Sequence, residues 1–245
     1  MKASAYKPGE ELWKPALQTQ DVHVWCVSLS SSPEALSRFE QVLSSDERER
    51  AARYRFAVHR YRFAAARAAL RYLLAAYTGT GPAQIQFREG LHGKPALADV
   101  SSVKFNASHS GDLGLYAVAY SRELGVDIEQ HRVLDDFEDV ASHYFATPEQ
   151  AQLKLLPAKE RAVAFFRCWT RKEAYVKAVG VGLSCPLASF SVSLDEEPTR
   201  VIEGVGGAWR LFDVSPFAGY SAALVTDGEP GAMLCGYVDD PAKLG

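Results

Sequence analysis

The chain has 245 residues, of which 47% are hydrophobic and 23% are charged, and this average globular composition excludes an intrinsically disordered protein. The net charge of −3 excludes a nucleic-acid binder that is basic throughout its length. Residues 1–122 carry 16 basic and 11 acidic side chains, whereas residues 123–245 carry 11 and 19. This asymmetry suits an anionic ligand on one side and a cation on the other, although chance scatter of charge gives the same pattern.

Four cysteines, Cys26, Cys168, Cys185 and Cys235, occur without a CxxC pair or clustered histidines at zinc spacing. Their apolar neighbours favour buried free thiols in a reducing compartment. The N-terminal residues lack the apolar core of a secretory signal, and no apolar stretch is long enough to span a membrane. These features predict a cytoplasmic protein.

The first half of the sequence predicts a strand, then helices, then short strands. Residues 22–29 form a mostly apolar run that is typical of a buried strand. A turn is expected at 30–33, and Pro33 favours the start of a short helix there. Residues 46–58 have helical character, and the strongest predicted helix covers residues 59–77 and ends at TGTGP. Short strands are expected at 85–88, 105–108 and 115–120.

The second half repeats this order. A strand is predicted at 125–129, and helices are expected at 135–145, 148–155 and 159–179. Thr147 is the expected N-cap of the second of these helices, and Gly180 is expected to end the third. Further strands are predicted at 190–194, 209–214, 220–225 and 234–238.

Helical segments followed by strands therefore occur twice. The sequences GLYAVAY (114–120) and GYSAALV (219–225) also occupy similar positions, although this short match does not prove a repeat. The pattern predicts an α+β fold made of two similar halves, each with a long helix packed on a small, mainly antiparallel sheet. The expected halves are residues 1–122 and 123–245.

The GVDIEQ sequence places two carboxylates on one predicted strand. Because side chains alternate between the faces of a strand, Asp127 and Glu129 point the same way. Neighbouring carboxylates repel each other, and a hard divalent cation between them relieves the repulsion. Oxygen ligands without nearby His or Cys favour Mg²⁺ or Mn²⁺ over zinc. The alternative is a solvent-facing acidic pair on an edge strand.

The predicted helix at 159–179 carries an apolar stripe made of Phe165, Trp169, Val176 and Val179. Lys172 lies on this stripe, and we expect its methylene groups to pack there while its ammonium reaches water. Glu173 and Lys177 lie one turn apart beside the stripe. They form either an exposed ion pair or a third metal-binding carboxylate with an ammonium for a phosphate.

Further cationic or basic groups precede this helix. Ser108 and His109 lie at a predicted strand end, where a His holds a phosphate or acts as a base, although a lone His is more often structural. Lys94 lies in the Gly-Pro turn of HGKPAL. Arginine is a good phosphate ligand, and the alternatives for the arginine-rich stretch are a solvated helix face or an RNA-binding arm. The stretch contains Arg48, Arg50, Arg53, Arg55, Arg60, Arg62, Arg67 and Arg71.

Four segments, in this order, resemble those of 4′-phosphopantetheinyl transferases of the surfactin-synthetase-activating (Sfp) type. They are GKP (93–95), FNASHS (105–110), GVDIE (125–129) and WTRKEAYVKAVGVGL (169–183). The resemblance covers about residues 45–192, and D-x-E followed by W-x-x-K-E-A-x-x-K is its most specific part.

The resemblance implies a pseudo-dimer of two α+β halves with coenzyme A between them. It also implies the activity: the 4′-phosphopantetheine arm of coenzyme A moves to a serine hydroxyl of an apo carrier protein, and adenosine 3′,5′-bisphosphate is released. Acyl, peptidyl and polyketide carrier proteins are the expected partners. The enzyme is expected to be a monomer that binds neither nucleic acid nor membranes.

The resemblance also implies roles for individual residues. The Mg²⁺ ligands, with Mn²⁺ as an alternative metal, would be Asp127, Glu129 and Glu173. Lys177 and His109, with Ser108 beside them, would contact the pyrophosphate or the 3′-phosphate. The adenosine 3′-phosphate end would be held by Lys94, Arg62 and Arg50, with Arg48 or Arg53 as alternatives to Arg50. Glu173 is the expected base, either directly or through a metal-bound water.

Three other interpretations remain open from the sequence. One is a different Mg²⁺-dependent phosphotransferase or phosphohydrolase with the same carboxylates. The second is a non-catalytic RNA-binding module that uses the arginine-rich helix, which leaves the spaced acids unexplained. The third is an inactive family member that acts as a scaffold, and the presence of all three carboxylates counts against it.

Overall fold

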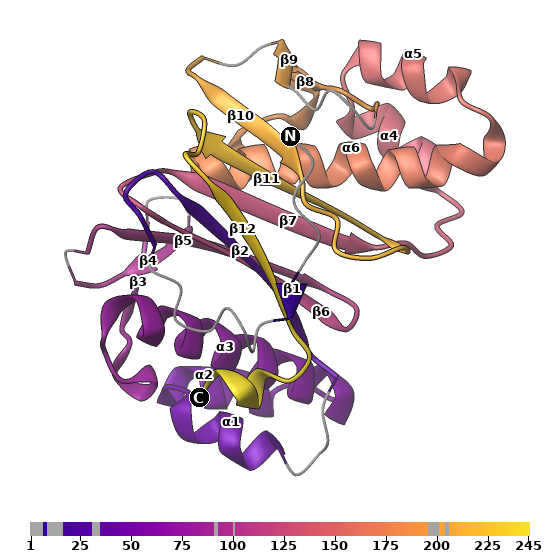
Figure 1. Cartoon of the computed structure of the whole chain (residues 1–245). Coiled ribbons are helices and arrows are strands. Elements are labelled where there is room, and N and C mark those ends of the chain that lie inside the picture. Colours follow the sequence, from indigo (N-terminus) through magenta and orange to yellow (C-terminus); the bar gives the residue numbers. More distant parts are fainter. Residues whose placement is uncertain are drawn as a thin grey trace.

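The computed structural model describes residues 7–8, 17–30, 35–90, 93–99, 101–195, 201–203 and 206–245 (Figure 1). A five-stranded sheet forms the centre of the first half. Its strands, in spatial order, are β1 (Lys7–Pro8), β12 (Met233–Val238), β2 (Val22–Ser28), β6 (Leu113–Tyr120) and β5 (Val103–Ser110). Strand β2 pairs in parallel with β12 and antiparallel with β6, and its position inside the sheet explains its mostly apolar sequence.

Three helices cover one face of this sheet: α1 (Leu36–Val42), α2 (Ser45–Ala52) and α3 (Ala57–Thr78). Small and apolar side chains of α3 pack between the sheet and α1. Leu73 belongs to the same buried cluster as Trp25 of the sheet, and Ala65 belongs to the same cluster as Phe39 of α1. Helix α3 ends at Gly79, whose φ of 72° is in the left-handed region that favours glycine. A small hairpin, β3 (Phe87–Glu89) with β4 (Pro95–Leu97), follows.

The second half contains a three-stranded antiparallel sheet in the order β10 (Trp209–Asp213), β11 (Tyr220–Asp227) and β7 (Leu124–Gln130). The long helix α6 (Ala158–Val179) lies on it, with α4 (Phe137–Tyr144) and α5 (Thr147–Leu155) alongside. A Cβ atom added at Gly125 would lie 2.2 Å from the Ala174 carbonyl oxygen, so glycine allows β7 to approach the α6 backbone directly. Short strands β8 (Ser191–Val192) and β9 (Val201–Glu203) pair with each other.

The two sheets pack face to face, so that the molecule has layers of helices, sheet, sheet and helix (Figure 1). Apolar side chains of β2 and β6, such as Val24 and Leu115, form the core between the sheets with Val126, Ile128 and Leu224 of β7 and β11. Strand order and direction are the same in β2-β6-β5 and β7-β11-β10. The predicted α+β fold with two similar halves is therefore confirmed.

The chain crosses between the halves twice, from β6 to β7 and again from β11 to β12. The last strand, β12, belongs to the sheet of the first half, and the final 3₁₀ turn, Pro241–Leu244, packs near α3 through the buried Leu244. The division of the chain between residues 122 and 123 remains a prediction. Within the described part of the chain, no helix is both long and apolar enough to cross a membrane.

Several predicted boundaries are wrong. The helix expected at 46–58 ends at Ala52, and α3 begins at Ala57, so residues 53–56 form a bend. Thr147 is not an N-cap, because it lies inside α5 and Ala146 is the capping residue, whose N–H donates to Glu149 Oε2 at 2.7 Å. The strand predicted at 85–88 is Phe87–Glu89, and that at 190–194 is only Ser191–Val192. The turn expected at 30–33 lies mostly outside the described residues.

The four cysteines are free thiols. Cys26, Cys168 and Cys235 are buried, as the sequence predicts, whereas Cys185 is half-buried. Burial raises the pKa of both Cys26 and Cys235 to about 12, so these thiols stay protonated and unreactive at neutral pH.

Candidate active site

The two halves meet where β5 runs beside β7, and side chains of β5 bridge the gap. Asn106 Oδ1 accepts the Val126 N–H at 2.9 Å, and Ser110 Oγ donates to Glu129 Oε2 at 2.7 Å. Asn106, Ser108 and Ser110 are two residues apart, so they share one side of β5. Sequence analysis missed Asn106 and Ser110, although the alternation within FNASHS would have identified both.

Asp127 is at the centre of this junction. Ser108 Oγ donates to its Oδ1 at 2.7 Å, and Lys177 Nζ donates to the same oxygen at 2.6 Å and to Ser108 Oγ at 3.0 Å. The second carboxylate oxygen, Asp127 Oδ2, is buried and has no hydrogen-bond partner in the described part of the chain. A buried acceptor without a partner is costly, which marks this oxygen as a place for a cation or a donor.

The other two predicted acids lie in the electrostatic field of Asp127. Burial raises the pKa of Glu173, the Asp127 carboxylate raises it further, and the Lys177 ammonium opposes the shift. Burial also raises the pKa of Glu129, against the effect of the Ser110 hydrogen bond and with the help of Asp127. The structure thus brings Asp127, Glu129, Glu173 and Lys177 together as one interacting group of charges.

This group suits a divalent cation in its chemistry. The donors are carboxylate oxygens, which Mg²⁺ and Mn²⁺ prefer, and Asp127 Oδ2 is an acceptor that no described residue satisfies. Among the described residues, however, no three or more acidic, His or Cys side chains are arranged to hold a metal. Binding one would therefore require the three carboxylates to converge.

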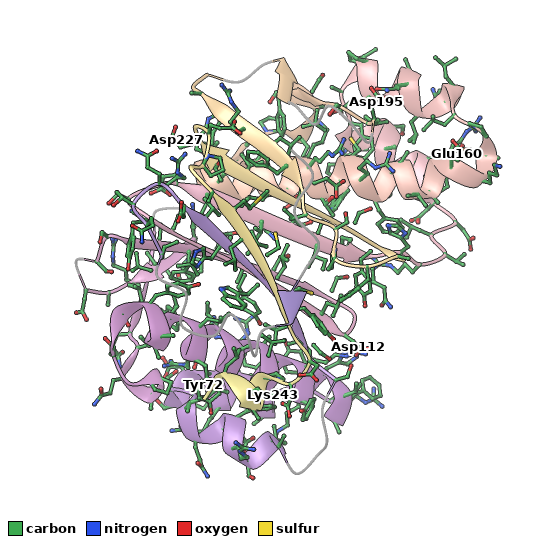
Figure 2. The ribbon with its side chains drawn as sticks, viewed as in Figure 1. Tyr72, Asp112, Glu160, Asp195, Asp227 and Lys243 are labelled. Atoms are coloured by element: carbon green, nitrogen blue, oxygen red, sulfur yellow. The ribbon has the colours of Figure 1, made fainter. Side chains whose placement is uncertain are left out.

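The predicted cationic residues lie on the first-half side of this group. His109 is exposed but surrounded by protein on several sides, and this desolvation lowers its pKa, as do the Lys177 and Arg50 charges. The Arg50 guanidinium lies 5.2 Å from the ring centre of Phe63. Arg62 Nε donates to Asp112 Oδ1 at 2.9 Å at the turn between β5 and β6, where Figure 2 shows Asp112 beside the helices of the first half.

A cavity of about 630 Å³ opens between the halves next to these charges. Trp169 forms part of its apolar wall, where it packs on Tyr144 with ring centres 5.8 Å apart. Glu173 and Lys177 of the second half and Lys94 of the first half supply the charged part of the lining. Other lining residues come from both halves and include Asn106, His143, Val176, Cys185 and Leu187.

Lys172 does not behave as predicted, because its ammonium is fully buried rather than in water. Its Nζ donates to the carbonyl oxygens of Leu187 and Phe190 at 2.8 and 2.6 Å and lies 2.8 Å from Glu149 Oε2. Lys172 therefore attaches the chain segment that contributes Leu187 to the cavity wall. Its partners are distant in sequence, which is why the apolar stripe alone suggested a solvated ammonium.

Comparison with known proteins gives consistent matches over both halves. Residues 27–121 match the family described as "4′-phosphopantetheinyl transferase, N-terminal", and residues 123–225 match the "4′-phosphopantetheinyl transferase superfamily". The chain is 37% identical over 228 residues to the 4′-phosphopantetheinyl transferase HetI of Nostoc sp., which covers 89% of this chain and 95% of the relative. The chain belongs to the 4′-phosphopantetheinyl transferase superfamily.

Other relatives agree with this assignment. A putative 4′-phosphopantetheinyl transferase of Synechocystis sp. is 38% identical over 148 residues, which is 60% of each chain. The 4′-phosphopantetheinyl transferase Sfp of Bacillus subtilis is 30% identical over 172 residues, covering 70% of this chain and 75% of the relative. As a 4′-phosphopantetheinyl transferase, the protein transfers phosphopantetheine to carrier proteins, and this confirms the predicted function over the RNA-binding and phosphohydrolase alternatives.

Proposed function

We propose that the protein is an Sfp-type, Mg²⁺-dependent transferase that uses coenzyme A as donor and apo acyl, peptidyl or polyketide carrier proteins as acceptors. The observation that carries this proposal is the cavity between the halves, which is apolar along Trp169 and charged at Glu173 and Lys177. An apolar wall suits a pantetheine arm, and an ammonium beside carboxylates suits a pyrophosphate with its metal ion.

The contacts proposed for coenzyme A are assigned from the positions of the cationic side chains. Lys177 and His109, with Ser108 beside them, would bind the pyrophosphate. Arg50 and Arg62 would bind the adenosine 3′-phosphate, because a guanidinium matches a phosphate with two parallel hydrogen bonds. The resemblance also assigns Lys94 to this phosphate, whereas its ammonium already has three protein acceptors.

The metal would be held by Asp127, Glu129 and Glu173, and it would supply positive charge that stabilises the phosphates. Glu173 is the proposed base, because its carboxylate lines the cavity one helical turn from Lys177. It takes the serine proton while the serine oxygen attacks the phosphorus that carries pantetheine. The bond from that phosphorus to the adenosine 5′-phosphate oxygen breaks, and Lys177 stabilises the charge on the departing bisphosphate.

A mass measurement tests the proposal. The purified protein is incubated with coenzyme A, Mg²⁺ and a panel of apo carriers, and each carrier is weighed by mass spectrometry. We expect one phosphopantetheine per carrier, loss of the reaction in EDTA and recovery with Mg²⁺ or Mn²⁺. No mass gain on any carrier would contradict the proposed activity, and full activity in EDTA would contradict the proposed dependence on a metal ion.

We also propose a monomer that works in the cytoplasm without nucleic-acid or membrane partners. The free thiols support a reducing compartment, and the paired arginines support a folded helix rather than an RNA-binding arm. Light scattering at several concentrations tests the monomer. Salt-dependent binding of RNA would contradict the absence of a nucleic-acid partner.

A further inference from the structure

The Lys94 ammonium makes three hydrogen bonds that have no role in the proposed mechanism. It follows Gly93 in the GKP turn of the first half, and its Nζ donates to Glu123 Oε2 at 3.0 Å, to the Leu124 carbonyl at 3.0 Å and to the Ala178 carbonyl at 3.1 Å. An ammonium has three N–H donors, so all of them have acceptors. The side chain is only 20% exposed.

The acceptors belong to the two elements that carry the charged group. Leu124 is the first residue of β7, three residues before Asp127, and Ala178 lies in the last turn of α6, directly after Lys177. The carbonyl end of a helix carries partial negative charge, which favours a cation at this place. The Lys94 chain also reaches the end of the helix, since a Cβ at Gly180 would lie 3.4 Å from its Cδ.

We propose that Lys94 is a positioning residue that ties the GKP turn of the first half to the end of α6 and the start of β7, and thereby sets where the Glu173–Lys177 pair and Asp127 lie relative to the first half. The inference rests on the proposed function of those side chains. It differs from the phosphate contact that the sequence resemblance implies for Lys94. A phosphate would have to displace one of three existing hydrogen bonds, two of which satisfy backbone carbonyls.

The placement of Lys94 supports this role in a second way. Burial lowers the pKa of Lys94, and its hydrogen bond to Glu123 opposes that shift. Protein groups therefore surround most of this ammonium. At Gly125 the backbones of β7 and α6 are already in direct contact, so a tie at their adjoining ends controls how these two elements are placed against the first half.

The chain offers a matched control in Lys104. Its Nζ lies 3.0 Å from the other oxygen of Glu123, and its side chain is 42% exposed. Lys104→Met removes the same charge and a contact to the same carboxylate. Unlike Lys94, Lys104 has no hydrogen bond to β7 or α6 in the described part of the chain.

The experiment compares Lys94→Met, Lys104→Met and the unmodified enzyme with coenzyme A and with 3′-dephospho-coenzyme A. For Lys94→Met we expect kcat to fall about tenfold or more, because misplacement of catalytic groups slows the reaction. The KM for coenzyme A should stay within about twofold and the preference for the 3′-phosphate should be unchanged, because substrate binding is retained. Amide hydrogen exchange should become faster at the end of α6 and the start of β7, whereas Lys104→Met should change none of these quantities.

Two results would overturn the inference. In Lys94→Met, a raised KM for coenzyme A with lost preference for the 3′-phosphate would show that Lys94 is a phosphate ligand. Unchanged amide hydrogen exchange at the end of α6 and the start of β7 would show that Lys94 does not tie these elements to the first half. If Lys94→Met does not fold, Glu123→Gln weakens one of the three contacts and should give smaller changes in the same direction. An unmodified enzyme that is inactive with every carrier would contradict the proposed function, while hydrogen exchange would still decide the role of Lys94.

Discussion

The two halves use the same device to fix their long helices. Helices α3 and α6 each have 22 residues and end at a glycine in the left-handed region. Eight residues before that glycine, each helix has a buried cation, Arg71 or Lys172, paired with a glutamate of the preceding short helix, Glu47 or Glu149. Each glutamate also accepts the N–H of its own N-cap residue, and each cation also donates to two carbonyls of the following segment.

The halves differ in what lies between the first strand and the long helix. In the first half, Tyr77 OH accepts from Trp25 Nε1 at 2.7 Å and is 2.8 Å from His23 Nδ1, which makes a closed network. In the second half, Lys177 and Asp127 leave one carboxylate oxygen buried without a partner in the described part of the chain. We call the first half, where all these polar groups are paired, the closed side. We call the second half, where Asp127 Oδ2 is available to a ligand, the open side.

The largest expected effect concerns Glu173 and Asp127 on the open side. Glu173→Gln or Asp127→Asn should lower kcat for carrier modification by about 10³-fold, because each removes a proposed metal ligand and Glu173→Gln also removes the base. Thermal unfolding should show that both variants fold. Glu138→Gln, which changes an exposed acid of the same half, is the control and should remain active. Normal turnover by either site variant would remove that residue from the mechanism.

The shared device is tested by Arg71→Met and Lys172→Met. Lys172→Met leaves the buried Glu149 without its cation, so the free energy of unfolding should fall by about 3–5 kcal/mol. Arg71→Met leaves Glu47 still paired with Arg67, so its loss should be smaller, at about 1–3 kcal/mol, because the hydrogen bonds of Arg71 to the Pro82 and Ile85 carbonyls disappear. Urea unfolding measures this loss. Because Lys172 also holds the Leu187 carbonyl at the cavity wall, only Lys172→Met should reduce the activity of the folded fraction. A loss below about 1 kcal/mol in either variant would show that the buried cation does not stabilise that half.

The closed side should respond to acid. Burial lowers the pKa of His23 to about 4 from its ordinary 6.5, with Asp21 opposing. Below about pH 6.5 the unfolded chain binds this proton and the folded chain does not, so the unfolding free energy should fall by up to about 3 kcal/mol as the pH drops to 4. His23→Gln should flatten this part of the stability curve, as measured by urea unfolding at several pH values. An identical curve for the variant would contradict the assignment.

The smallest expected effect concerns Arg62, the proposed ligand of the adenosine 3′-phosphate. Arg62→Ala should raise the KM for coenzyme A about tenfold with little change in kcat, because a contact far from the reacting phosphorus acts equally on substrate and transition state. Arg60 lies on the same helix as Arg62, and Arg60→Ala, which removes an ion pair with Glu40 of α1, is the matched control. Steady-state kinetics decide the matter, and an unchanged KM would exclude Arg62 from the donor site.

The sequence predicts the two long helices well because each has a clear apolar pattern and a glycine at its end. It also places Asp127, Glu129, Glu173 and Lys177 correctly in neighbouring elements. The bend at residues 53–56 escapes prediction because its residues have no strong breaker, and packing of α3 on the sheet sets where the helix begins. The environments of Lys94 and Lys172 escape it because their partners are up to 84 residues away.

The position of β12 has a consequence for how the protein folds while the ribosome synthesises it. This strand fills the space between β1 and β2, in register from Met233 opposite Val22 to Val238 opposite Val27. Residues near the end of the chain therefore complete the sheet that begins near its start. Until they emerge, the edge of β2 has unpaired backbone groups, a known risk for aggregation of nascent chains. The first half is synthesised first, but it can finish folding only after the second half has been made.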